Sequence, residues 1–154
     1  MHKMLKEKLW AYIVHNNPDL MFNLQEDYSV THYLDEKVNG IMPMAERLLA
    51  ERKPLYVIEE LCVNEMTEEL RPSRFLYLRE MLEQEFPDDW QRLREDGLLT
   101  YEIINIMECC REIFESLTFS IENKDNRNIH HTIVGHVRKH LAKNMGTTVS
   151  KKDR

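Results

Sequence analysis

The stretch "SRFLYLREMLEQEFP", Ser73 to Pro87, decides the fold class of this chain. Its apolar residues recur three and four positions apart, which is the spacing of one buried face of an α-helix. These residues are Phe75, Leu78, Met81, Leu82 and Phe86. Ser73 is a preferred N-cap residue, and Pro87 ends the pattern. The stretch therefore predicts an amphipathic helix.

The same pattern recurs along most of the chain. Helices are predicted at residues 3–15, 29–39, 44–52, 55–70, 88–96, 101–117 and 129–141, and an irregular stretch at 17–27. Gly40 and Pro43 leave two alternatives: a new helix begins at Pro43, or one long helix kinks there. No stretch favours a strand. The prediction is an all-α fold: a single-domain bundle of six or seven helices joined by short loops over residues 1–144, followed by a disordered basic tail at 145–154.

Composition agrees with a helical protein and narrows its class. The sequence is 42% hydrophobic and 31% charged, with only 4 Gly and 5 Pro, which argues against a β-sandwich or barrel built on many tight turns. No stretch has the ~20 apolar residues of a membrane span, and no signal peptide is recognised. Three cysteines, Cys62, Cys109 and Cys110, suggest reduced thiols rather than a disulfide framework. We therefore expect a cytoplasmic protein without membrane contact.

The same Ser73–Pro87 stretch resembles an uncharacterised bacterial family of small all-helical proteins, a domain of unknown function. The residues that carry the likeness are Ser73, Arg74, Phe75, Leu78, Leu82, Glu85 and Phe86. Asn17-Pro18 after the first helix is similar too, whereas the helix after Asn126 departs from the family's pattern. Members are commonly encoded on conjugative transposons. The resemblance implies an all-α fold and a mobile-element context, and it carries no reaction, cofactor or catalytic residue.

Motifs of several enzyme classes are absent from the sequence. There is no GxGxxG, P-loop, HExxH, GxSxG or CxxC, and no Glu-x-x-His of the kind that binds di-iron centres in helical bundles. The glutamates of residues 59–69 and 80–85 are interpreted as solvated helix faces. We therefore expect no catalytic residues and no cofactor, and a protein that is not an enzyme.

Four of the seven histidines lie in "IHHTIVGHVRKH", residues 129–140. Only His136 and His140, at positions i and i+4, are placed to bind one metal ion from a single helix face. A zinc site needs at least one further protein ligand, for which His15, His32, Cys109 or a carboxylate are the alternatives. Cations beside the pair disfavour a divalent metal. No metal site is predicted, with His136 and His140 as weak candidates.

Charge is divided unevenly along the chain. Residues 1–123 contain 13 Lys/Arg and 25 Asp/Glu, whereas residues 124–154 contain eight Lys/Arg and two Asp/Glu. The candidate nucleic-acid-binding residues of this basic end are Arg127, His131, Arg138, Lys139, Lys143, Lys151 and Lys152. Such residues suit phosphate contacts, although no aromatic residues alternate with them to stack bases. Docking of the basic end on the acidic body is the alternative.

Two functions follow from these observations. The favoured one is a non-enzymatic helical protein-interaction or accessory module of a mobile element, with a protein partner or self-association, a homodimer being the simplest form. The alternative is a nucleic-acid-associated accessory factor that uses the basic C-terminal helix and tail.

Overall fold

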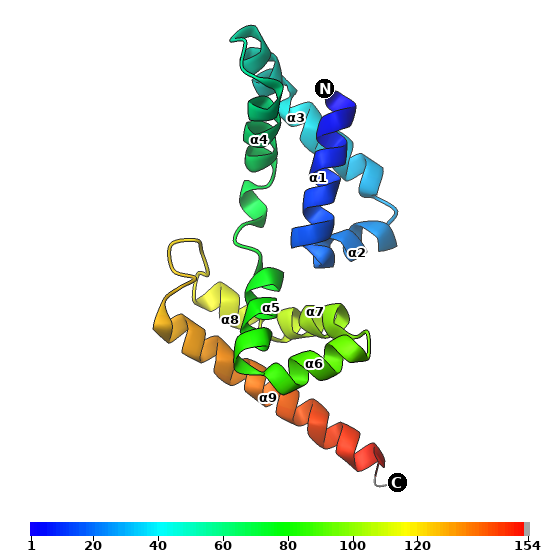
Figure 1. Ribbon diagram of the computed structural model, residues 1–154, viewed down its shortest axis with the longest axis vertical. Helices are drawn as coiled ribbons and strands as arrows, with labels where there is room; N and C mark the ends of the chain where they lie inside the picture. The colour runs from blue at the N-terminus through cyan, green and yellow to red at the C-terminus, as the bar shows by residue number, and fades with distance from the viewer. Residues whose placement is uncertain (153–154) are drawn as a thin grey trace. The chain divides into compact units, whose positions relative to one another are not determined.

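The computed structural model describes the backbone of residues 1–152 and the side chains of residues 1–143. Over the described backbone the chain forms nine α-helices and one short 3-10 helix, η1, and contains no strand (Figure 1). The predicted all-α fold is confirmed, with more helices than the six or seven expected.

The chain divides into two compact units, Met1–Ser73 and Arg74–Arg154. Each unit has its own hydrophobic core, and the two cores share no residue. Sequence analysis did not anticipate the two cores because no linker rich in Gly, Pro or Ser separates the units. The single domain over residues 1–144 stays a prediction.

The N-terminal unit consists of α1 (His2–Asn16), α2 (Pro18–Glu26), α3 (Val30–Ala50), α4 (Leu55–Met66) and η1 (Glu68–Leu70). In this unit α1 packs against both α3 and α4 (Figure 1). The core consists of buried residues of these three helices: Leu5, Leu9, Ile13, Leu34, Val38, Ile41, Ala45, Leu48, Ile58, Cys62 and Met66. Their helical spacing leaves the opposite faces of the helices to polar residues.

The C-terminal unit consists of α5 (Arg74–Glu85), α6 (Pro87–Glu95), α7 (Leu99–Cys109), α8 (Arg111–Ser116) and α9 (Arg127–Lys152). Four of the five residues predicted to face the core from α5 are buried, and Phe86 is half-buried against the same core. The rest of the core comes from α7, α8 and α9: Ile103, Ile106, Cys110, Phe114, Ile133, Val134, Val137 and Leu141. This core holds α9 in the unit.

The structure corrects two of the predicted segments and selects one of the two alternatives around Gly40 and Pro43. The irregular stretch predicted at 17–27 is wrong, because Pro18 occupies the first turn of α2, where a missing N–H is no loss. The helix around Gly40 is continuous from Val30 to Ala50 with Pro43 inside it, which decides between the two alternatives. The single helix predicted at 101–117 is also wrong, because the backbone breaks at Cys110 between α7 and α8.

Four helices end in a left-handed residue, a geometry that glycine adopts most easily. After α6 that residue is Gly97, with φ of 71°, and Leu98 donates its backbone N–H to Leu93 O at 2.9 Å. The backbone N–H of Gly97 itself bonds to Arg94 O, which makes a pair of hydrogen bonds at this helix end. An equivalent pair closes α2, α3 and α8, where the left-handed residues are Tyr28, Arg52 and Thr118. Only one of the four ends therefore has the glycine that marks such an end in a sequence.

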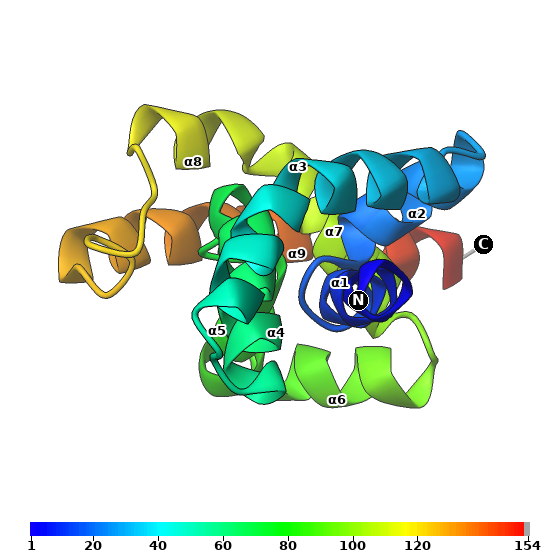
Figure 2. The same cartoon turned by 90° about the horizontal axis from the view of Figure 1, so that it is seen from above.

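The last helix begins after an irregular loop that follows α8 (Figure 2). Asn126 caps it, since its side-chain oxygen accepts the backbone N–H groups of Asn128, at 2.9 Å, and Ile129, at 3.2 Å. The α9 backbone continues to Lys152, which is longer than predicted. The side chains from residue 144 onward, and with them those of the candidates Lys151 and Lys152, lie outside the described residues, and the disordered tail at 145–154 stays a prediction.

Candidate nucleic-acid interface

The basic residues predicted to contact phosphate lie on the solvent-exposed side of α9. Arg127, His131, Arg138, Lys139 and Lys143 are all exposed. The opposite side holds Ile133, Val134, Val137 and Leu141 in the core of the C-terminal unit. At ~100° per residue, the exposed residues span an arc of about 160° around the helix. The sequence therefore divides α9 into a buried apolar side and a cationic face, defined here by those five exposed residues.

Three cations of this face lack an ion-pair partner among the described side chains. Arg127, Arg138 and Lys139 form no ion pair with any residue whose side chain is described, although the Arg138 guanidinium lies 5.7 Å from the centre of the Phe86 ring. Three other cations of the unit are paired with carboxylates: Arg92 with Asp89, Arg111 with Glu108 and Lys124 with Asp125. Arg79 and Arg94, which are also exposed, lie against the Trp90 ring instead. Unpaired charges are the ones free to attract an anionic partner.

The composition of α9 strengthens this contrast. Its 26 residues contain six Lys/Arg and no Asp or Glu, whereas residues 74–126 of the same unit contain six Lys/Arg and 13 Asp/Glu. A polyanion approaching the unit is repelled by the acidic part and attracted by α9, so its orientation is restricted. For Arg127, Arg138 and Lys139, no ion pair with a described side chain supports the alternative from the sequence, in which the basic end docks on acidic residues.

Two of the four α9 histidines connect the helix to carboxylates of the unit. His140 Nε2 lies 2.7 Å from Glu102 Oε1 of α7, and the two side chains are only 15% and 18% exposed. His130 Nε2 lies 3.3 Å from Glu85 Oε1, and its Nδ1 lies 3.4 Å from Tyr77 Oη; both partners are on α5. These pairs fix the rotation of α9 about its axis, which directs the cationic face toward solvent.

The weak metal candidates are not brought together with further ligands. The side chains of residues 1–143 contain no group of three or more His, Cys, Asp or Glu able to hold a metal ion. His140 faces Glu102 instead, and His136 is half-buried one turn earlier. The residues that sequence analysis missed are Glu85 and Glu102, because nothing in the sequence associates them with histidines 45 and 38 positions away.

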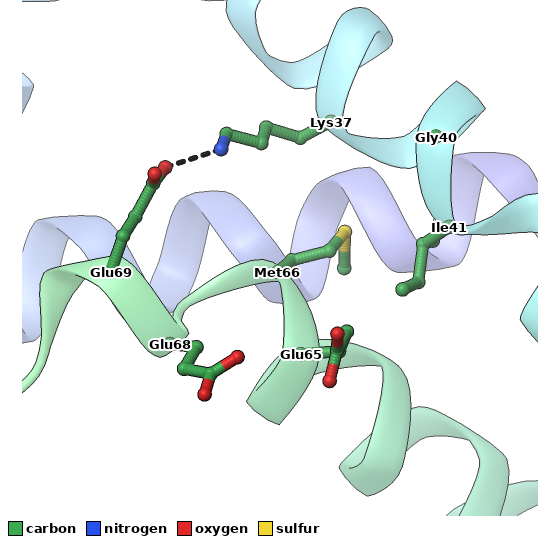
Figure 3. Close-up of a pocket in the computed structure, with 7 residues that line it drawn as sticks. All are labelled: Lys37, Gly40, Ile41, Glu65, Met66, Glu68 and Glu69. Carbon is green, nitrogen blue, oxygen red and sulfur yellow. Dashed lines mark hydrogen bonds and ion pairs between the residues drawn. The ribbon is translucent and has the colours of Figure 1, made fainter.

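A second surface feature is a pocket of about 410 Å³ in the N-terminal unit. Figure 3 shows Ile41 and Met66 at its apolar part, with Lys37 of α3 directed toward Glu69 of η1. The other lining residues are Gly40, Glu65 and Glu68. The hydrogen bond that Lys37 donates to the Glu69 carboxylate is the largest cause that raises the pKa of Lys37 above its ordinary value, which keeps this amine protonated. The pocket is therefore lined by one paired lysine, three glutamates and two apolar side chains.

The glutamates interpreted as solvated helix faces are exposed or weakly paired. Glu59 lies 4.0 Å from Lys8, and Glu69 is paired with Lys37, while Glu65 and Glu68 are exposed. Exposed pairs of this kind contribute little to stability.

The cysteines differ in accessibility, which predicts their order of alkylation. Burial, with a smaller contribution from Cys109, raises the pKa of Cys110 to about 11, and burial raises the pKa of Cys62. Because the thiolate is the reactive form, iodoacetamide at about pH 8 is expected to modify only exposed Cys109 in the folded protein. Mass spectrometry of the intact chain checks this, and Cys109→Ser should remove the modification. Native labelling of Cys110 at the rate of Cys109 would contradict the described packing.

No helix of the described residues combines the length and apolar character required to cross a membrane. Comparison with protein-family models, curated protein sequences and solved structures found no match for this chain.

Proposed function

We propose that the protein is a non-enzymatic accessory factor that binds nucleic acid through the cationic face of α9. The observation that carries the proposal is that Arg127, Arg138 and Lys139 are exposed and form no ion pair with a described side chain, on a helix whose sequence contains no carboxylate. Neutralising phosphates releases counterions from a nucleic acid, so such a surface gains affinity without reading a sequence. The resemblance at Ser73–Phe86 adds a mobile element as the proposed setting, and the cysteine usage adds the cytoplasm as the proposed compartment.

Salt-dependent binding of a labelled DNA duplex tests the proposal. The triple variant Arg127→Gln, Arg138→Gln and Lys139→Gln removes three candidate phosphate contacts from exposed positions. Measured by fluorescence anisotropy between about 50 and 200 mM salt, its slope of log K against log salt should be smaller by about 3. Its affinity at low salt should fall by more than about tenfold.

A matched control keeps the same change in charge but removes paired cations. The variant Arg92→Gln, Arg111→Gln and Lys124→Gln lies in the same unit, and each of its three side chains has a carboxylate partner. It should retain most of the binding. Equal losses in the two triple variants would show that only net charge matters, and the absence of binding at low salt in the unmodified protein would refute the proposal.

The second candidate function, a protein-interaction module that self-associates, is favoured by the turn between α3 and α4. Leu49, Leu55 and Tyr56 are 47%, 52% and 71% exposed there, close together in the chain. Apolar side chains grouped in this way can be covered by a second copy. Size-exclusion chromatography with light scattering should then give a dimer that Leu55→Ser with Tyr56→Ser converts to a monomer. A monomer at high concentration of the unmodified protein would contradict this candidate.

A further inference from the structure

The exposed arc of α9 is organised as two rows of basic residues with a central strip between them. At ~100° per residue, Arg127, His131 and Arg138 fall within about 40° of one another, and Lys139 and Lys143 form a second row about 120° further round the helix. The central strip consists of Asn128, Gly135 and Ala142, which lie between the rows. Small and amide side chains are thus flanked on both sides by basic ones.

We propose that this face lies in the major groove of duplex DNA, with one basic row against each phosphate backbone and the central strip facing the base edges. The inference rests on the proposed nucleic-acid function and names the form of nucleic acid that the face fits. A helix is about 10–12 Å across, and the major groove of B-form DNA is about 12 Å wide. Two basic rows on opposite flanks of the exposed arc match the two strands that border such a groove.

The central strip suits a close approach to base edges. Asn128 is exposed, and its side-chain amide has no hydrogen-bond partner among the described residues, which leaves it available for the paired donor and acceptor of an adenine. A Cβ added at Gly135 would meet no atom within 4 Å, so the space above the middle of the strip is open. Ala142 presents only a methyl group, the kind of group that contacts a thymine methyl.

Other nucleic acids fit this face less well. Single strands are held mainly by bases stacked on aromatic side chains, and the exposed residues of α9 through Lys143 include no Phe, Tyr or Trp. Duplex RNA has a deep and narrow major groove that a helix does not enter. The face therefore favours duplex DNA over both.

The test compares three probes on the full chain: a DNA duplex, one of its single strands and an RNA duplex of the same sequence. Two matched glycine variants accompany the unmodified protein. Gly135→Leu places bulk in the middle of the central strip, whereas Gly40→Leu makes the same change in α3, where an added Cβ also meets no atom within 4 Å. Circular dichroism of both variants checks that they keep the helix content of the unmodified protein.

The DNA duplex should bind most tightly, and Gly135→Leu should weaken that binding by about tenfold or more while Gly40→Leu leaves it unchanged. Methylation of guanine N7, a major-groove atom, should weaken binding as well. Equal affinity for the three probes, no effect of N7 methylation, or equal effects of the two glycine variants would overturn the major-groove inference while leaving the proposed function intact. No binding to any probe at low salt would refute both.

Discussion

Replacing Phe114 with alanine is expected to lower the free energy of unfolding by about 3–5 kcal/mol, the range for removing a buried aromatic side chain. Phe114 is 0% exposed and lies at the centre of an aromatic cluster in the C-terminal unit. Its ring centre is 4.9 Å from that of Phe119 and 6.1 Å from that of Tyr77, both in edge-to-face arrangements. The Arg74 guanidinium lies 5.1 Å from the same ring centre.

The loss has two causes that add. Burial of the ring removes apolar surface from water, and its edge-to-face contacts contribute a further ~0.5–1.5 kcal/mol each. Urea denaturation followed by circular dichroism measures the change, with Ile121→Ala as the control because Ile121 is 52% exposed. The control should stay within about 0.5 kcal/mol of the unmodified protein. Equal effects of the two substitutions would contradict the described core.

Replacing Leu9 with alanine is expected to lower the free energy of unfolding by about 2–5 kcal/mol. Leu9 is 0% exposed on α1, whose other fully buried residues are Leu5 and Ile13. Because α1 packs against both α3 and α4, the cavity left by Leu9 opens where three helices meet. Rigid neighbours on several sides collapse poorly into such a space, which favours the upper part of the range.

Hydrogen exchange locates the effect of each core substitution. Since the two cores share no residue, Leu9→Ala should reduce amide protection mainly in α1, α3 and α4, and Phe114→Ala mainly in α5, α7 and α9. The control for Leu9 is Leu61→Ala on α4, where the side chain is 38% exposed. A uniform loss of protection over the whole chain after either substitution would argue against two separate cores.

The all-α fold and most helix positions could be predicted because helical spacing is a local property of the sequence. The segment Arg74–Glu85 is the clearest case, since apolar periodicity, a cap residue and a terminating proline agree within a few positions. The helix Pro18–Glu26 was not predicted, because the residue that ends it in the left-handed conformation is Tyr28 rather than glycine. The break at Cys110 has neither glycine nor proline, so no local signal separated α7 from α8.

The features of the candidate interface likewise fall into those that depend on neighbouring residues in the sequence and those that depend on tertiary packing. The exposure of Arg127, Arg138 and Lys139 follows from the position of the apolar residues on α9 and was predictable. The pairing of His130 with Glu85 and of His140 with Glu102 was not, because partners far apart in the sequence meet only through tertiary packing. The absence of ion pairs between Arg127, Arg138 or Lys139 and any described side chain is likewise a property of the folded unit.

The left-handed residues at the ends of α2, α3 and α8 are positions where a substitution can raise the free energy of unfolding. A residue with a side chain at positive φ is strained, and glycine avoids this strain. Because Tyr28 is 97% exposed, packing of its side chain contributes little stability to offset the strain. Glycine at Tyr28 or Arg52 would relieve that strain within the N-terminal unit and leave the surface of α9 unchanged. These two turns are therefore suitable sites for stabilised versions of the protein in which weak binding can be measured without losses to unfolding.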